Sequence, residues 1–156
     1  MQTRRAVLIA AALAPWKLAC AESLLPAATD LQQLAAEGAR LNAPIVLLFS
    51  TPGCPYCREV RRNYLVPRSA DLAPATRMLL CEIDITSSER LVDFEGRATT
   101  QAHFASGLGV RVVPVVMAFD RRGQPVGEPL VGLDRSGFYE AYLQKLIDGA
   151  RQQVSR

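Results

Sequence analysis

Residues 109–119 read Gly-Val-Arg-Val-Val-Pro-Val-Val-Met-Ala-Phe, an apolar run with a proline at its centre. Proline cannot donate a backbone hydrogen bond, so it seldom occurs in the middle of a β-strand. One physical solution is a cis peptide bond between Val113 and Pro114, with the strand beginning at the proline. The sequence therefore predicts a cis Val113–Pro114 bond that faces the cysteine pair of the chain.

The cysteine pair lies in Cys54-Pro55-Tyr56-Cys57, which follows a continuous apolar run at residues 45–49 and opens a predicted helix. This position puts the first sulfur at a helix N-terminus, where unpaired N–H groups and the helix dipole favour negative charge. Such surroundings lower the pKa of a thiol from about 8.5 into roughly the 3.5–7.5 range. We therefore expect Cys54 to be the nucleophile and Cys57, more deeply buried, to be the resolving thiol.

Three neighbouring residues are candidates for tuning the two sulfurs. Pro55 and Tyr56 lie between the cysteines, and Arg58 follows directly. A guanidinium close to the Cys54 thiolate would stabilise its negative charge. The alternative for Arg58 is a solvated arginine on the outer face of the helix.

The Cys-x-x-Cys spacing alone leaves three other interpretations open, namely half of a zinc site, a structural disulfide and a chance pair. Zinc needs two further ligands, and beyond residues 1–21 the chain offers Cys81 and His103. Because these two fall on a predicted strand and a separate predicted helix, we expect no metal and no other cofactor. A disulfide across four residues restricts the unfolded chain very little, which disfavours a purely structural role.

Hydrophobic periodicity predicts alternating helices and strands along the chain. The expected order is helix 27–42 capped by Asp30, strand 45–49, helix 58–65 ended by Pro67, strand 78–84, helix 100–106, strand 110–119, turn 120–123, strand 126–131 and helix 136–151. Five side chains at the last helix are expected to face inward: Phe138, Tyr142, Leu143, Leu146 and Ile147. This order is typical of an α/β fold with helices flanking a central mixed sheet.

Residues 1–21, MQTRRAVLIAAALAPWKLACA, have the three parts of a secretory signal peptide. Arg4 and Arg5 precede nine apolar residues, and an Ala-x-Ala cleavage signal ends at Ala21. The arginine pair also resembles a twin-arginine signal, so two export routes stay open. Nine apolar residues are fewer than the about twenty that span a bilayer as a helix, so we expect no stable membrane insertion. The expected product is a single domain at residues 22–156, periplasmic or secreted.

Composition and charge argue against two classes of protein. The chain has 156 residues, of which 49% are hydrophobic and 21% charged, a balance that excludes a disordered protein. It carries 18 Lys and Arg against 15 Asp and Glu, but three of the basic residues and none of the acidic ones lie in residues 1–21. Cleavage would therefore leave a neutral domain, which gives no support to nucleic-acid binding.

Together, the Cys-x-x-Cys helix and the proline strand resemble the thioredoxin superfamily over roughly residues 30–150. The resemblance implies a thioredoxin-like fold and thiol–disulfide exchange between the cysteine pair and protein substrates. It also implies that Val113 offers backbone hydrogen bonds to a substrate chain bound beside Cys54. With the leader, the sequence is similar to the secreted thioredoxin-like proteins, which include the SoxW-like group linked to sulfur oxidation.

Two departures from the thioredoxin pattern bear on mechanism. Leu48 stands where thioredoxins usually hold a buried aspartate, which leaves water or Glu59 to deprotonate Cys57. Gly53 precedes Cys54, and the intervening dipeptide is Pro-Tyr, as in glutaredoxins and some periplasmic disulfide-exchange proteins.

The expected function is that of an exported thiol–disulfide oxidoreductase, in which Cys54 and Cys57 reduce protein disulfides. A membrane thiol–electron donor then returns Cys54 and Cys57 to their reduced form. Family resemblance favours the reductase, and a disulfide oxidase or isomerase is the alternative in the same class. Two alternatives belong to other classes, namely a non-enzymatic thioredoxin-fold binding module and a metal chaperone.

Overall fold

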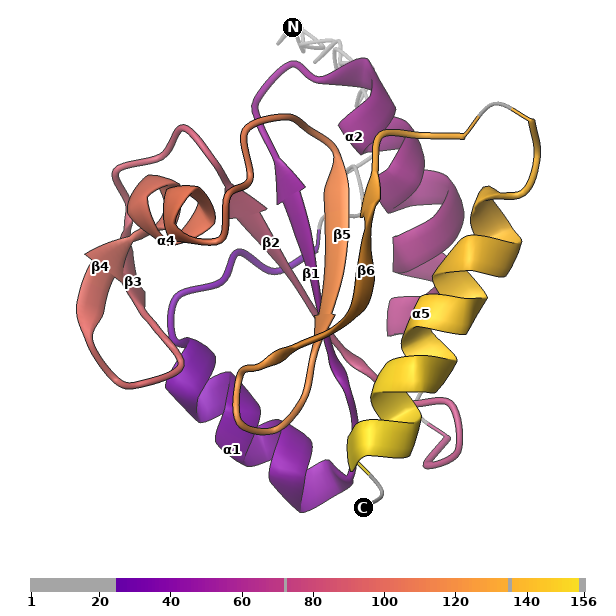
Figure 1. Cartoon of the computed structure of the whole chain (residues 1–156), viewed down its shortest axis with the longest axis horizontal. Helices are drawn as coiled ribbons and strands as arrows, with labels where there is room; N and C mark the ends of the chain where they lie inside the picture. Colours follow the sequence, from indigo (N-terminus) through magenta and orange to yellow (C-terminus); the bar gives the residue numbers. More distant parts are fainter. Residues whose placement is uncertain (1–24, 72, 135, 155–156) are drawn as a thin grey trace, which may run out of the picture.

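A mixed four-stranded sheet lies at the centre of the computed structural model, which describes residues 25–71, 73–134 and 136–154 (Figure 1). The strands are β1 (Ile45–Ser50), β2 (Leu79–Asp84), β5 (Val115–Phe119) and β6 (Pro125–Val131). Their order is β2-β1-β5-β6, in which β2 runs parallel to β1 and the other two neighbouring pairs are antiparallel. The predicted leader lies outside the described residues.

Helices cover both faces of this sheet, which confirms the predicted fold class. They are α1 (Leu31–Leu41), α2 (Pro55–Val60), a π-helical segment (Arg61–Leu65), α3 (Val66–Ser69), α4 (Gln101–Gly107) and α5 (Tyr139–Val154). A second sheet, which the sequence analysis missed, pairs β3 (Arg90–Val92) with β4 (Ala98–Thr100). Within the described residues, no helix is long and apolar enough to cross a membrane.

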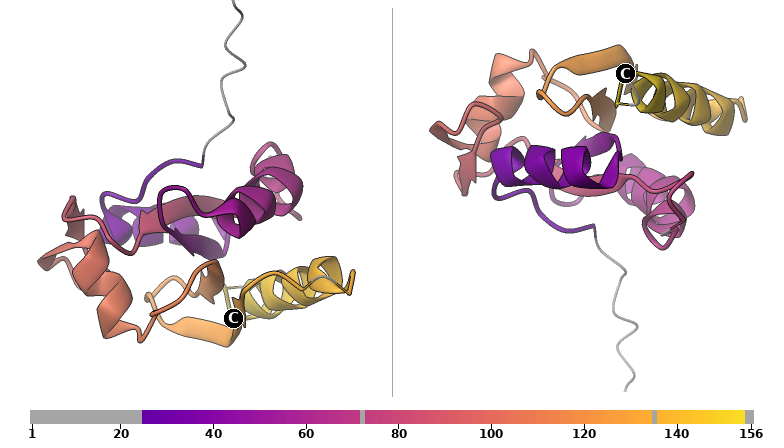
Figure 2. Two further views of the ribbon diagram at one scale, coloured as in Figure 1. Left: turned by 90° about the horizontal axis from the view of Figure 1, so that it is seen from above. Right: turned by 90° about the horizontal axis from the view of Figure 1, so that it is seen from below.

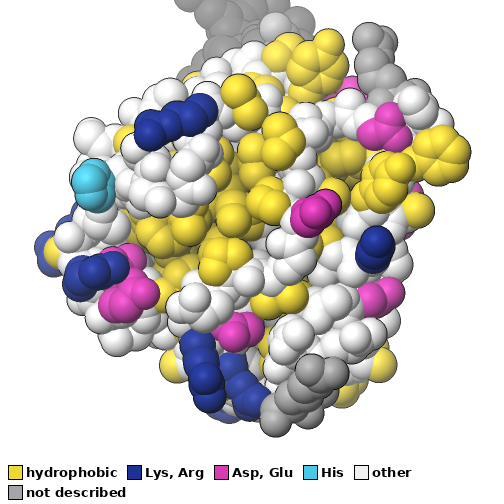
Figure 3. All heavy atoms as spheres, viewed as in Figure 1, with side chains coloured by type: hydrophobic (Ala, Val, Ile, Leu, Met, Phe, Trp, Pro, Cys, Tyr) yellow, Lys and Arg dark blue, Asp and Glu magenta, His cyan; other side chains and the backbone are white. Residues whose placement is uncertain are grey.

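Two hydrophobic cores lie on opposite faces of the sheet. One packs α1, β3 and α4 against the sheet, and the other packs α2, the π-helical segment and α5 against its opposite face. The first and second halves of the chain lie side by side and meet where β1 pairs with β5 (Figure 2). On the face shown in Figure 3, hydrophobic side chains gather across the middle and Lys and Arg lie nearer the edge. Strand β1 is buried along its whole length because it has a core on each side.

Helix α1 confirms its predicted cap but begins later than expected. The Asp30 carboxylate accepts a hydrogen bond from the backbone N–H of Gln33 at 2.7 Å, as an N-cap does. Residues 27–30 are not helical, because Ala28 donates its backbone N–H to the carbonyl of Glu82 and so lies along β2.

The prediction that Pro67 ends its helix is wrong. The chain continues from α2 through the π-helical segment into α3, with Pro67 in the first turn of α3. A proline inside an α-helix clashes with the carbonyl four residues earlier. Here Val66 donates its N–H to the Arg61 carbonyl, a wider π-type bond, and this wider turn accommodates the proline.

Two of the five side chains expected to face inward at the last helix do not. Phe138 lies before the start of α5 and is 60% exposed, and Tyr142 is 52% exposed. Tyr139 is buried instead and packs against Tyr64, with ring centroids 4.7 Å apart. The helix begins at residue 139 rather than 136, which leaves Phe138 outside it, and its inward face runs through Tyr139, Leu143, Leu146, Ile147 and Ala150.

Candidate active site

Cys54 and Cys57 lie where β1 passes into α2, and they form a disulfide with a Cα–Cα distance of 5.3 Å. Cys54 is the N-cap of α2, and its Sγ accepts a hydrogen bond from the backbone N–H of Cys57 at 3.1 Å. Cys57 is fully buried, whereas Cys54 is partly exposed. The site therefore presents one sulfur at the surface and keeps the other inside the protein.

The residues around Cys54 direct the chain from the strand into the helix. Gly53 has a φ of +76°, a left-handed conformation that glycine adopts without strain. Pro55 occupies the first turn of α2, where a helix has no partner for a backbone N–H. Cys54 donates its N–H to the Thr51 carbonyl at 3.3 Å and accepts from the N–H of Arg58 at 3.2 Å.

The Val113–Pro114 peptide bond is cis and directly precedes β5. Strand β5 takes up only the part of the apolar run 110–119 that follows the proline, so the strand begins where the cis bond predicts and residues 110–113 lie outside it. In the antiparallel β1–β5 ladder Phe49 pairs with Val115, which places Pro114 at the end of the sheet where β1 leads toward Cys54. Pro114 is buried, and its carbonyl accepts from the Gly132 N–H at 2.8 Å. The proposed contact between Val113 and a substrate chain stays a prediction.

Pro55, Tyr56 and Arg58 all have exposed side chains, and about half of the Tyr56 surface is accessible. Each is therefore placed where it can contact a bound partner. Arg58 also lines a cavity beside Cys54. The tuning role of these three residues stays a prediction.

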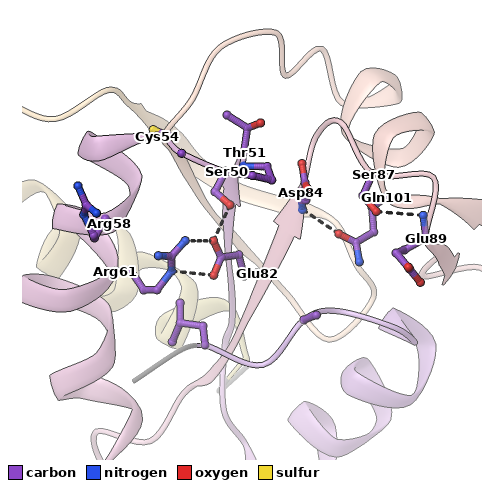
Figure 4. Close-up of a pocket in the computed structure, with 14 residues that line it drawn as sticks. Ser50, Thr51, Cys54, Arg58, Arg61, Glu82, Asp84, Ser87, Glu89 and Gln101 are labelled. Carbon is purple, nitrogen blue, oxygen red and sulfur yellow. Dashed lines mark hydrogen bonds and ion pairs between the residues drawn. The ribbon is translucent and has the colours of Figure 1, made fainter. Parts of the chain in front are cut away.

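The cavity beside Cys54 has a volume of about 430 Å³ and opens between α2, the end of β1 and β2 (Figure 4). Its walls carry five charged side chains: Arg58, Arg61, Glu82, Asp84 and Glu89. Polar groups thus surround the more exposed sulfur on this side.

Arg61 and Glu82 form an ion pair on the cavity wall that the sequence analysis missed. Arg61 Nε lies 2.8 Å from Glu82 Oε2, and its Nη2 contacts Glu82 Oε1. Ser50, on β1, donates its hydroxyl to the same Oε1 (Figure 4). The two charged side chains are only 13% and 14% exposed. Arg61 is therefore part of a largely buried ion pair and not of a solvated helix face.

One signal in the sequence pointed to this pair. Glu82 interrupts the apolar run Met78-Leu79-Leu80-Cys81, which reads as a buried strand. A carboxylate in such a strand needs a partner, because burying an unpaired charge is strongly unfavourable. The pattern could not identify Arg61, which lies 21 residues away in the chain.

Cys81 and His103, the other candidate zinc ligands, lie on separate elements. Cys81 is free and buried in the core under α1, on the opposite face of the sheet from α2. Burial raises the pKa of its thiol to about 11. His103 is exposed on α4. Among the described residues, no three His, Cys, Asp or Glu side chains are grouped so as to hold a metal ion.

A family profile for a thioredoxin-like domain matches residues 29–147, which is well over half of the chain. The chain belongs to the thioredoxin-like family. No curated protein matches this thioredoxin-like chain by sequence.

Solved thioredoxins share the fold of this thioredoxin-like chain. The thioredoxin of Fasciola hepatica is 12% identical, with a TM-score of 0.54 over 81% of this chain and 99% of that one. A Schistosoma mansoni thioredoxin pre-protein, in its reduced form, is 18% identical, with a TM-score of 0.52 over 82% and 99%. A mutant thioredoxin from Halobacterium salinarum is 24% identical, with a TM-score of 0.51 over 81% and 91%. The fold and the bonded cysteine pair together support a thiol–disulfide oxidoreductase.

Proposed function

We propose that the protein reduces disulfide bonds in protein substrates, with Cys54 as nucleophile and Cys57 as resolving thiol. The observation that carries this proposal is the asymmetry of the pair. Cys54 is partly exposed and its Sγ accepts the Cys57 N–H, whereas Cys57 is buried. In the reduced protein the same N–H favours a Cys54 thiolate, because a hydrogen bond to the charged form stabilises it.

The exchange begins when the Cys54 thiolate attacks one sulfur of a substrate disulfide. A disulfide forms between Cys54 and the substrate, and the other substrate sulfur leaves as a thiolate that takes up a proton. Cys57 then loses its proton and attacks Cys54 Sγ, which closes the Cys54–Cys57 disulfide and releases the second substrate thiol. The pair has given two electrons and two protons to the substrate, and a dithiol donor must reduce it again.

The direction of electron flow rests on resemblance to thioredoxin-like reductases. A reduction potential near about −270 mV for the Cys54–Cys57 couple would support the reductase, and one near about −120 mV would support an oxidase. Equilibration of the protein with redox buffers of known potential, followed by thiol trapping, measures this quantity.

We also infer export, in which residues 1–21 are removed near Ala21 and a membrane dithiol protein supplies electrons outside the cytoplasm. The support is the arrangement of Arg4, Arg5 and the apolar run of the leader. Mass spectrometry of the protein from its native compartment should find an N-terminus at Glu22. Intact Met1 on the native protein would contradict this part of the proposal.

Reduction of insulin disulfides tests the activity directly. The wild-type protein with dithiothreitol should precipitate insulin chains well above the rate with dithiothreitol alone, and Cys54→Ser should abolish this gain. Cys81→Ala is the matched control, because Cys81 is a buried cysteine remote from the pair, and it should keep most of the activity. An inactive wild-type protein would favour the binding module, and turnover that survives Cys54→Ser would remove Cys54 from the mechanism.

A further inference from the structure

Cys54 and the Arg61–Glu82 pair border the same cavity. Cys54 and Arg61 are seven residues apart on one continuous helical segment, which is close to two turns and brings them to the same side of it. At about 1.5 Å per residue, the two positions are separated by roughly 10 Å along the helix. Glu82 reaches the guanidinium from β2, so both charges lie on the wall of the cavity that Cys54 also lines (Figure 4).

Three elements hold these two charges in place. Arg61 comes from the π-helical segment, Glu82 from β2, and the Ser50 hydroxyl that binds Glu82 from β1. Ser50 is 4% exposed, and the two charged side chains are nearly as buried. Charges that are fixed and largely removed from water are screened less than surface charges, so they act on a neighbouring thiolate more strongly.

We propose that the Arg61–Glu82 pair sets the stability of the Cys54 thiolate and thereby the reduction potential of the Cys54–Cys57 couple. The proposal rests on the proposed function, since it assigns positioning residues to the same cysteine pair. Arg61 attracts the thiolate, and Glu82 repels it and restrains the guanidinium. The two opposite charges of Arg61 and Glu82 therefore partly cancel in their effect on the stability of the Cys54 thiolate relative to the thiol.

The proposal fixes the sign of each change. Glu82→Gln removes a negative charge from the cavity, which should lower the pKa of Cys54 and make the couple more oxidising. Arg61→Gln removes a positive charge and should do the reverse. A unit charge about 10 Å away, acting through an effective dielectric constant of about 20, should move the pKa of Cys54 by about one pH unit. The double variant should return near the wild-type value.

The experiment measures how fast iodoacetamide alkylates Cys54 as a function of pH, in the full chain carrying Cys57→Ser. Mass spectrometry of the peptide that contains Cys54 separates its signal from that of Cys81. The reduction potential is measured in parallel on proteins that keep both cysteines. Arg58, Asp84 and Glu89 also face the cavity but are the same in every variant, so the differences report on the pair.

Two control variants separate charge from structure. Glu140→Gln removes the carboxylate of another ion pair, with Arg68, that lies outside the cavity, and should leave the Cys54 profile unchanged. Glu82→Asp keeps the charge and should stay close to wild type. If a glutamine variant does not fold, Arg61→Met and Glu82→Met provide a second pair of substitutions with side chains of similar length.

The proposal is supported if Arg61→Gln and Glu82→Gln shift the pH profile of Cys54 alkylation, and the reduction potential, in opposite directions from wild type. Displacements in the same direction, or none in either variant, overturn it, because structural damage would follow from the loss of either partner. These measurements need no substrate, so an inactive protein would defeat the proposed function while the alkylation profiles still decided the role of the pair.

Discussion

Leu48 and Glu82 are register partners in the parallel β1–β2 ladder, and their side chains therefore project from the same face of the sheet. Leu48 is fully buried in the core formed with α2 and α5, and Glu82 is held beside it by Arg61 and Ser50. Thioredoxins usually hold an aspartate at the position of Leu48. In this chain that position is apolar, and the carboxylate lies on the neighbouring strand at the cavity.

Introducing the aspartate at Leu48 should destabilise the protein. Leu48→Asp places a carboxylate at a fully buried position, so we expect a loss of at least about 3 kcal/mol in the free energy of unfolding. Urea denaturation followed by circular dichroism measures the loss. The control, Leu48→Met, keeps the volume and should lose less than about 1.5 kcal/mol. An aspartate variant as stable as the methionine variant would show that this core tolerates charge.

Cys81 should react with alkylating reagents far more slowly than Cys54 in the reduced protein. Because burial raises the pKa of Cys81 to about 11, only about one molecule in a thousand carries its thiolate at pH 8. Its reactivity should rise about tenfold for each pH unit up to that pKa, provided that the fold persists. Peptide mapping after brief treatment with iodoacetamide measures both rates. Equal labelling of Cys81 and Cys54 at pH 8 would contradict the burial of Cys81.

Substitution of Gly123 should damage the β5–β6 hairpin and spare the active site. Gly123 has a φ of +75°, and a Cβ there would lie 2.2 Å from Cγ of Phe94. We expect Gly123→Ala to lower the free energy of unfolding by about 1–3 kcal/mol and to leave insulin reduction by folded protein unchanged. Turn 120–123 follows the C-terminal end of β5, whereas Pro114 precedes the other end.

The matched control for Gly123 is Gly149, which lies inside α5 with open space around its missing Cβ. Gly149→Ala should stabilise the protein by roughly 0.5–1 kcal/mol, since alanine favours the helix over the unfolded chain. If Gly123→Ala and Gly149→Ala both lowered the free energy of unfolding, the contrast between a crowded Gly123 and an unhindered Gly149 would be contradicted.

The hydroxyl of Tyr139 should be dispensable for stability. It is buried and has no hydrogen-bond partner among the residues that the structure describes. Tyr139→Phe removes this unsatisfied group and keeps the ring against Tyr64, so we expect a gain of up to about 1 kcal/mol. Tyr139→Ala, which also removes the ring, should lose about 3–5 kcal/mol. Thermal or urea unfolding of the two variants checks both values, and a clear loss in the phenylalanine variant would mean that the hydroxyl has a partner.

Features with a local cause were predictable from the sequence. The apolar run at 45–49 became β1 because such a run has to be buried on both faces. Asp30 caps α1 and the turn at 120–123 connects two strands, since both depend on residues a few positions apart. The cysteine pair was recognisable from its spacing after β1, and the proline strand favoured the redox interpretation of it.

Features that depend on the exact course of the backbone or on distant partners were not predictable in the same way. The helix passes Pro67 because the turn before it widens, and no residue type signals that widening. Phe138 precedes α5, and Tyr142 lies to one side of the inward face, which tertiary packing centres on Tyr139, Leu143 and Leu146. The Arg61–Glu82 contact joins two elements that periodicity analysis treats separately.

The bonds between residues 26–28 and Glu82 have a consequence for self-association. The backbone N–H of Glu82 donates to the Pro26 carbonyl, and the backbone carbonyl of Glu82 accepts from the Ala28 N–H. Residues 26–28 therefore cover part of the outer edge of β2. The opposite edge strand, β6, carries Pro125, Pro129 and a break in register, all of which discourage another strand from pairing with it. A chain cut back to Asp30 would uncover β2 as a template for a second molecule. By occupying this edge, residues 26–28 oppose edge-to-edge pairing of two molecules.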